Sequence, residues 1–171
     1  MIGAVAGDII GSIYEWKNIK TKDFNLFGED CDYTDDTVCT VAVADWLVTS
    51  GDLSDILGGY ALRYPGRGYG GMFLDWASQP ARTPYNSWGN GSAMRVSPVA
   101  HFARDEREVL ALAEKSAAVT HNHPDGIAGA QATALTMWMA VENADGATIR
   151  REITERFDYD LSQSVDEIRE W

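Results

Sequence analysis

Apolar residues recur at helical spacing along most of this 171-residue chain, and no convincing segment alternates apolar and polar residues as a strand does. Clusters of glycine, proline and asparagine interrupt the pattern, and such clusters are typical of loops between helices. Hydrophobic residues make up 45% of the sequence, an ordinary share for a chain that buries one core. The sequence therefore predicts an all-α, single-domain compact helical bundle.

The breaks in the pattern divide the chain into expected helices. These cover residues 2–14, 35–48, 52–61, 73–77, 93–103, 106–119, 124–142 and 148–157, with loops over 65–71 and 79–91. Gly51 is expected to stop the second helix and Asp52 or Ser54 to start the third. Ser164 and Glu167 have capping-box spacing, so a last helix should begin there and run toward Trp171. A helix that short needs something to dock against.

The charge, the cysteines and the length of the apolar runs limit the partners and the location that we expect. The net charge of −12 disfavours binding to nucleic acid, because an acidic surface repels phosphate backbones. Two cysteines without zinc-like spacing imply no disulfide framework and fit a reducing cytoplasm. No apolar run is long enough to cross a membrane. We therefore expect a cytoplasmic protein.

The segment Tyr33-Thr34-Asp35-Asp36-Thr37 places two carboxylates between hydroxyls where a helix should begin. Hard oxygen ligands of this kind suit Mg²⁺. Threonine and aspartate are also favoured as helix N-caps, so the same residues have a purely structural interpretation. Taken alone, the segment favours the cap.

Two glycine-rich segments are candidates for binding an anion. Gly89-Asn90-Gly91 lies immediately before an expected helix, and backbone N–H groups at such a place attract anions. A glycine-rich turn with an ordinary cap explains it equally well. The loop 65–71 is a second candidate, in which Tyr69 is available for stacking on a ligand.

The histidines and tryptophans divide by context. His121 is favoured as a site residue over His123, which is placed to cap the helix that starts at Pro124. His101 lies in an apolar helix and is expected to be structural or exposed. Trp88 is the better candidate for ligand stacking, since Trp46, Trp76 and Trp138 fall in helices where packing in the core is the default.

Taken together, these segments resemble the ADP-ribosylglycohydrolase family, of the dinitrogenase-reductase-activating type. The resemblance extends over essentially the whole chain. It rests on the order of Gly7-Asp8, Tyr14-Glu15, Thr34-Asp35-Asp36-Thr37, Gly89-Asn90-Gly91-Ser92-Ala93-Met94-Arg95 and Thr120-His121-x-x-Pro124.

The resemblance implies a helical bundle that holds two Mg²⁺ ions, or Mn²⁺, and hydrolyses the bond between ADP-ribose and a protein side chain or small molecule. Thr34, Asp35 and Asp36 would be metal ligands, and Glu15 would be the acid–base carboxylate, so that Glu15, Asp35 and Asp36 form the catalytic set. The ADP-ribose site would be formed by Gly68, Tyr69, Gly70, Gly71, Ser87, Trp88, Gly89, Asn90, Gly91 and His121.

The family's second metal motif, Gly-Asp-x-Asp-Thr near its C-terminus, has no counterpart in this sequence. The resemblance therefore implies a C-terminally shortened member. Three alternatives follow: a Mg²⁺-dependent hydrolase, a non-catalytic binder that sequesters ADP-ribose or a related signalling nucleotide, and a fragment without a function of its own. Exposed apolar faces would favour a homodimer.

Overall fold

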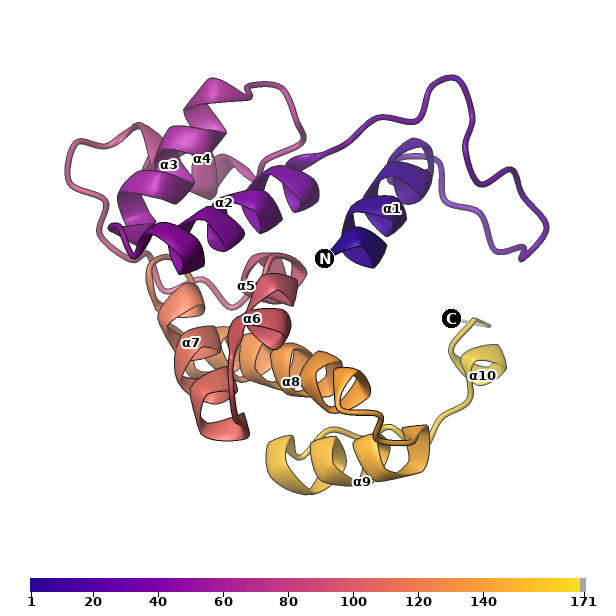
Figure 1. Cartoon of the computed structure of the whole chain (residues 1–171). Helices are drawn as coiled ribbons and strands as arrows, with labels where there is room; N and C mark the ends of the chain where they lie inside the picture. The colour runs from indigo at the N-terminus through magenta and orange to yellow at the C-terminus, as the bar shows by residue number, and fades with distance from the viewer. Residues whose placement is uncertain (170–171) are drawn as a thin grey trace.

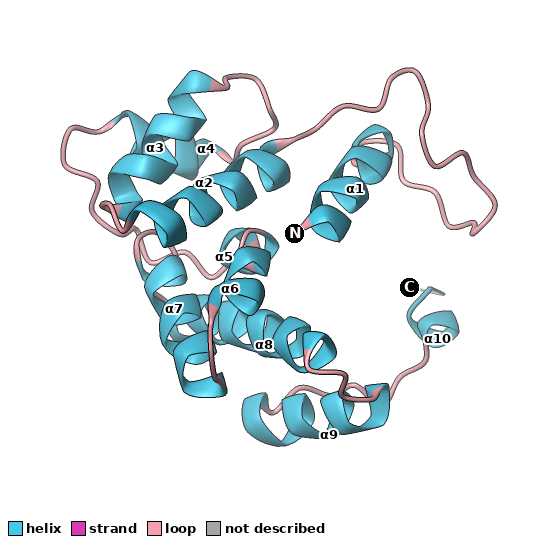
Figure 2. Ribbon diagram, viewed as in Figure 1, coloured by secondary structure: helices cyan, strands magenta, loops and turns pink. Residues whose placement is uncertain are grey.

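The structure is a computed structural model that describes residues 1–169. Its elements are α1 (Ile2–Gly11), the 3₁₀ helix η1 (Ser12–Tyr14), α2 (Asp35–Thr49), α3 (Leu53–Arg63), α4 (Gly71–Ser78), α5 (Gly91–Met94), α6 (Ser97–Phe102), α7 (Glu106–Ala118), α8 (Pro124–Val141), α9 (Gly146–Phe157) and α10 (Val165–Arg169). Figures 1 and 2 show helices joined by loops, and residues 1–169 contain no strand. The all-α prediction is confirmed.

Side-chain caps begin several helices where the sequence predicts them. The Asp52 carboxylate accepts the N–H of Asp55 at 3.0 Å, so Asp52 is the cap of α3. Ser164 and Glu167 exchange the two bonds of a capping box at the start of α10. The predicted continuation of this helix to Trp171 lies outside the described residues.

Two of the predicted helices are not continuous α-helices in the structure. The opening helix ends at Gly11 and tightens into η1. The predicted helix 93–103 is split into α5 and α6, because Pro98 has no N–H to donate to the carbonyl of Met94. The split leaves Arg95 between two short helices, where its side chain is only 1% exposed.

The end of α2 also differs from the prediction. Ser50, with φ of 57°, takes the left-handed position at the helix end. The adjacent Gly51 packs closely on the next helix, since a Cβ there would lie 3.0 Å from Cδ1 of Ile56.

The core lies among α2, α3, α4, α6, α7 and α8, while α1 packs beside α2 and has no buried residue. Trp76 is buried as predicted, and Trp46 and Trp138 pack partly buried against the same core. None of the helices in residues 1–169 combines the length and the apolar character that a membrane crossing requires. The larger buried apolar side chains are Val38, Val43, Leu47, Leu53, Leu57, Tyr69, Phe73, Trp76, Val96, Val99, Val109, Leu135 and Ile153, the last of them on α9.

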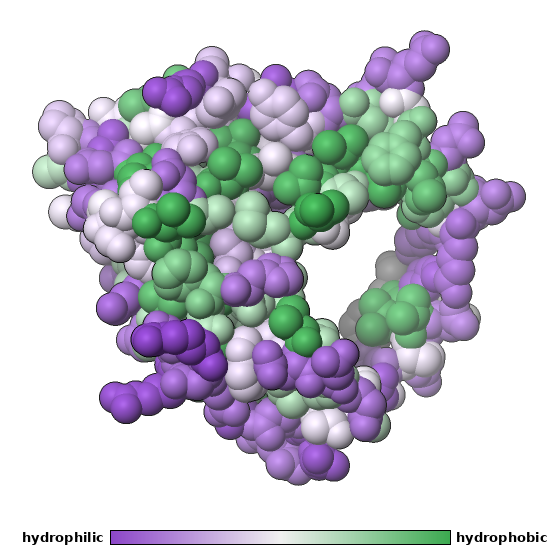
Figure 3. Space-filling model, viewed as in Figure 1, coloured by the Kyte–Doolittle hydropathy of each residue, from purple (hydrophilic) through white to green (hydrophobic). Residues whose placement is uncertain are grey.

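The helices at the two ends of the described chain carry strongly exposed apolar side chains. Ile2 on α1 and Val165 on α10 are 87% and 67% exposed. Figure 3 shows an opening in this face between α1 and α10, bordered above by apolar side chains. The well-packed part of the fold is therefore α2 to α8, and the candidate site lies where α1 meets it.

Candidate functional site

Three adjoining hollows surround the N-terminus of α2. The first, of about 470 Å³, lies between α1 and α2, and the second, of about 770 Å³, lies between η1 and the loop 66–68. The third, of about 300 Å³, lies between α2, α4 and the segment 85–95. Glu15 and Thr34 line both the first and second hollows, and Met94 lines both the first and third. We treat the three as one cleft.

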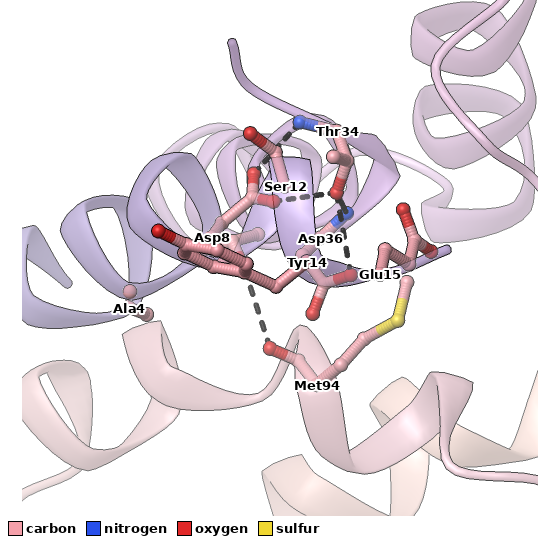
Figure 4. Close-up of a pocket in the computed structure, with 11 residues that line it drawn as sticks. Ala4, Asp8, Ser12, Tyr14, Glu15, Thr34, Asp36 and Met94 are labelled. Atoms are coloured by element: carbon pink, nitrogen blue, oxygen red, sulfur yellow. Dashed lines mark hydrogen bonds between the residues drawn. The ribbon is translucent and has the colours of Figure 1, made fainter. Parts of the chain in front are cut away.

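One side of the cleft, here called the acidic wall, consists of Asp8, Glu15, Asp35 and Asp36. Asp8 connects α1 to α2: its carboxylate accepts the backbone N–H groups of Thr34 at 2.8 Å and Thr37 at 3.1 Å, together with both hydroxyls. Figure 4 shows Asp8 and Thr34 facing each other across the two helices.

The other N–H groups at the start of α2 also have partners. The Asp35 N–H donates to the carbonyl of Arg67 at 2.8 Å, and the Asp36 N–H donates to the Thr34 hydroxyl at 3.4 Å. Thr34 is thus the N-cap of α2, as the structural interpretation predicted. Because these donors are used, the start of α2 presents carboxylate oxygens to the cleft and no anion site.

Glu15 and Asp35 meet at Gly68. A Cβ at Gly68 would lie 3.4 Å from Oδ1 of Asp35 and 4.0 Å from Oε2 of Glu15. The φ of Gly68 is +93°, which side chains rarely adopt. The predicted Gly68 therefore serves the acidic wall by leaving space beside two of its carboxylates.

Within residues 1–169, none of the four carboxylates of the acidic wall forms a salt bridge. Burial raises the pKa of Asp35 to about 6, and the Asp36 carboxylate adds to the shift. Burial also raises the pKa of Asp36, with further repulsion from Asp8 and Glu15. Binding a cation would relieve this repulsion.

The acidic wall fits Mg²⁺ by type of donor but not by number. Carboxylate and hydroxyl oxygens are the ligands that Mg²⁺ prefers. The Thr34 hydroxyl lies 3.5 Å from Oδ2 of Asp36. Within residues 1–169, however, no three His, Cys, Asp or Glu side chains converge where they could hold a metal ion. The described residues supply part of a coordination shell.

The opposite side of the cleft, here called the cationic wall, consists of Arg95, Thr120, His121 and the strip Gly89–Gly91. Arg95 donates through Nη2 to the carbonyl of Ser116 at 2.7 Å and to Oγ1 of Thr120 at 2.8 Å. Among the residues that the structure describes, no carboxylate forms an ion pair with this buried guanidinium. The cationic wall thus keeps one buried positive charge beside the third hollow.

His121 is held tightly within this wall. A Cβ at Gly91 would lie 2.9 Å from Cε1 of His121, and a Cβ at Gly126 would lie 2.7 Å from the carbonyl of Ser87. Both positions therefore need glycine. The His121 ring is 5% exposed, and burial, with the nearby Arg95 charge, lowers its pKa to about 4. The ring is neutral at physiological pH.

Most of the predicted ligand residues come together in the cleft. Gly68 lines the second hollow. The third is lined by Gly70, Gly71, Ser87, Gly89, Asn90, Gly91 and His121.

The two predicted aromatic stacking residues do not line these hollows. The Tyr69 ring is 8% exposed and stacks on Phe73, and its hydroxyl donates to the carbonyl of Tyr64 at 2.9 Å. Trp88 is 74% exposed, and its ring lies 6.2 Å from that of His123. In this conformation neither ring faces the interior of the cleft.

Three residues of the site were not among the predicted site residues: Asp8, Arg95 and Thr120. Asp8 follows Gly7 as a single acidic residue inside an apolar helix, which was a usable signal. Arg95 and Thr120 directly adjoin predicted segments, but only the fold shows that they bond to each other.

The remaining histidines lie where the sequence predicts. His123 caps α8, with its Nδ1 accepting the N–H of Asp125 at 3.2 Å. His101 is exposed, with Nε2 3.0 Å from the N-terminal amine of Met1. His121 is therefore the only histidine that lines the cleft in the described part of the chain.

Comparison with known proteins identifies relatives of this chain. The ADP-ribosylhydrolases ARH3 of Gallus gallus and Danio rerio are each 29% identical to this chain, over 83% and 84% of it. The match covers 49% and 47% of those proteins, so the chain spans about half the length of these curated relatives. The family model described as ADP-ribosylglycohydrolase matches residues 1–171. This chain belongs to the ADP-ribosylglycohydrolase family.

Proposed function

We propose that this chain binds the ADP-ribose part of an ADP-ribosylated protein side chain or small molecule in the cleft and contributes to its hydrolytic release. The observation that carries the proposal is the pairing of an acidic wall with a cationic wall across one cleft. Membership of the family and the likeness to relatives named ADP-ribosylhydrolases support the same reaction class.

The cationic wall suits a pyrophosphate. Arg95 places a buried positive charge beside the third hollow in a chain whose net charge is −12. Gly71 begins α4, whose N-terminal end favours an anion through the helix dipole. The strip Gly89–Gly91 has no side chain beyond Asn90 to obstruct a ligand. A diphosphate is therefore the part of ADP-ribose that this wall would bind.

The acidic wall suits the hydrolytic step. Glu15 and Asp35 approach the same point beside Gly68, so a water molecule held beside Asp35 would lie within reach of the Glu15 carboxylate. Asp35 belongs to the cation site of the proposal, and Glu15 is its acid–base carboxylate.

A divalent cation, Mg²⁺ or Mn²⁺, belongs to the proposal as a cofactor held in part by Thr34, Asp35 and Asp36. When bound, such an ion lowers the pKa of a bound water molecule and offsets carboxylate charge. Titrating Mg²⁺ into the chain should raise its melting temperature, and Asp36→Asn should abolish the increase. Glu114→Gln, a change of an exposed carboxylate on α7, should leave the increase intact.

The activity test uses peptides that carry ADP-ribosyl-arginine or ADP-ribosyl-serine, with Mg²⁺ and then with EDTA. The expected result is Mg²⁺-dependent release of free ADP-ribose, which Asp35→Asn abolishes and Glu114→Gln does not. Equal release by wild type and Asp35→Asn would refute the role of the acidic wall.

A second candidate is a non-catalytic binder of ADP-ribose. It is favoured by one observation: in residues 1–169 no three metal-ligating side chains converge. A one-to-one complex with ADP-ribose, with no product after hours in Mg²⁺, would select this candidate over the hydrolase.

A further inference from the structure

A chain of three side chains links the buried interior to the cleft. Arg95 donates to the Thr120 hydroxyl at 2.8 Å, and the same hydroxyl lies 2.7 Å from Nδ1 of His121. All three residues are at most 5% exposed. The direction of each bond can be deduced from which groups donate and which accept.

The Arg95 end fixes the first bond. A guanidinium has only donors, so Oγ1 of Thr120 must be the acceptor. The hydroxyl hydrogen of Thr120 then needs an acceptor of its own, because a buried donor left unpaired is costly. Among the described residues, Nδ1 of His121 is the acceptor that lies within hydrogen-bond distance.

The second bond determines the state of the imidazole. If Nδ1 accepts from Thr120, the ring proton of neutral His121 is on Nε2. A protonated ring is disfavoured, since the guanidinium of Arg95 is close and burial penalises a second positive charge. The opposite tautomer would leave the Thr120 hydrogen without a partner.

The donor nitrogen faces the cleft. A Cβ at Gly91 would lie 3.0 Å from Nε2 of His121, and one at Gly89 would lie 4.0 Å from it. These two glycines line the third hollow together with His121. The Nε2–H group is therefore directed toward the strip on which a ligand would lie.

We propose that Arg95, acting through the Thr120 hydroxyl, is a positioning residue that fixes His121 as the neutral Nε2–H tautomer and so gives the cleft a permanent donor for a phosphate oxygen. The identity of the ligand oxygen rests on the proposed function, whereas the tautomer does not. A neutral donor also keeps the same hydrogen-bonding pattern across physiological pH.

The first experiment reads the tautomer in the absence of ligand. Two-bond ¹H–¹⁵N spectra of the ¹⁵N-labelled chain distinguish a protonated ring nitrogen from an unprotonated one. The three histidines are assigned with His101→Gln and His123→Gln. The expected result for His121 is protonated Nε2 and unprotonated Nδ1, in one tautomer only. Protonated Nδ1, or a mixture of tautomers, would overturn the proposal.

Two substitutions of Thr120 test the link. Thr120→Val keeps the shape and removes the hydroxyl, so the Nδ1 resonance should shift and the second tautomer should appear. Thr120→Ser keeps the hydroxyl and should restore the wild-type pattern. A wild-type pattern in Thr120→Val would show that the hydroxyl does not set the tautomer.

A substitution of Arg95 tests the origin of the effect. In Arg95→Met the Thr120 hydroxyl no longer has to accept from a cation, so it can accept from Nδ1–H and both tautomers should be seen. A single Nε2–H tautomer in folded Arg95→Met would overturn the role of Arg95. If Arg95→Met does not fold, Arg95→Lys replaces it. This variant keeps a donor and the positive charge, so it should retain the single tautomer. A mixture of tautomers in Arg95→Lys would contradict the proposal.

Binding measurements with ADP-ribose separate the proposal on the His121 tautomer from the proposed function. Calorimetric titration with ADP-ribose should show about tenfold weaker binding for Thr120→Val, as expected for one hydrogen bond to a charged oxygen, and recovery in Thr120→Ser. Wild-type affinity in Thr120→Val would contradict the donor role. If ADP-ribose binds to none of the proteins, the proposed function fails, while the ring spectra still decide the tautomer.

Discussion

The two walls of the cleft are both charged, but they are built differently. The acidic wall is half-buried, is held by bonds between α1 and α2, and keeps carboxylates that repel one another. In the cationic wall the side chains of Arg95, Thr120 and His121 are buried, and neutral oxygens from Ser116 and Thr120 accept hydrogen bonds from the Arg95 guanidinium.

This difference indicates what each wall needs from a ligand. Neither wall receives its counter-charge from residues 1–169, so a ligand with a cation on one side and an anion on the other would complement both. Hydrogen bonds among buried groups hold the side chains of the cationic wall, whereas the acidic wall depends on how α1 sits against α2. Perturbing the two walls should therefore have different consequences.

The largest expected effect is the pH dependence of the cationic wall. The pKa of His121 is lowered from its ordinary value near 6.5 to about 4, so the unfolded chain binds more protons between these values. His121 should thus contribute stability that is fully present above pH 6.5 and lost as the pH falls toward 4. The contribution is at most about 3 kcal/mol. Urea denaturation of wild type and His121→Gln between pH 4 and 7 measures it, and parallel pH profiles would contradict it.

The next effect tests how closely the cationic wall is packed. Gly126→Ala should lower the free energy of unfolding by about 2 kcal/mol, because its Cβ would meet the Ser87 carbonyl and His121. Gly129→Ala, on the same helix with open space around it, is the matched control and should stabilise by up to about 1 kcal/mol. Thermal denaturation compares the two variants. Equal changes in stability would show that the close contact at Gly126 does not destabilise the alanine variant.

A smaller effect is expected where α1 joins α2. Asp8→Ala removes the acceptor for two N–H groups at the start of α2 and should cost about 1.5 kcal/mol. Hydrogen exchange should accelerate in α1 and the first turn of α2 but not in α8. Asp75→Ala, an exposed change on α4, is the control. Uniform exchange across the molecule would argue against a local role for Asp8.

The smallest effect has the opposite sign to that of His121. Because the pKa of Asp35 is raised to about 6, the folded chain binds more protons than the unfolded one between pH 4 and 6, and stability from this group is lost as pH rises. Asp35→Asn should stabilise the metal-free chain at pH 7 by about 1 kcal/mol, after allowance for partial exposure. The gain should vanish near pH 4. Melting curves of wild type and Asp35→Asn at pH 7 and pH 4 measure this difference. A lower stability of Asp35→Asn at pH 7 would contradict the repulsion between the carboxylates.

The sequence could predict the local features of the fold but not its contacts. The caps Asp52 and Ser164, and the N-cap role of Thr34, follow from side chains within a few residues. The bonds from Asp8 to α2 depend on how two helices pack, which periodicity does not specify. The break before α6 was readable from Pro98, because proline lacks the N–H that continues a helix.

The site shows the same division. Gly68 and Gly91, which were predicted to line the ADP-ribose site, both lie against charged or polar side chains, and their contact with ADP-ribose stays a prediction. The orientation of Tyr69 toward Phe73 and the exposure of Trp88 follow from tertiary packing. Metal binding by Thr34, Asp35 and Asp36 stays a prediction, as does the cytoplasmic location.

The most direct test of the proposed ligand site is a calorimetric titration of ADP-ribose, with and without Mg²⁺, into wild type, His121→Gln and His101→Gln. The proposal predicts one-to-one binding that Mg²⁺ strengthens, that His121→Gln weakens by about tenfold, and that the exposed control His101→Gln leaves unchanged. No binding by wild type, or equal affinities for the three proteins, would contradict the assignment of the cleft.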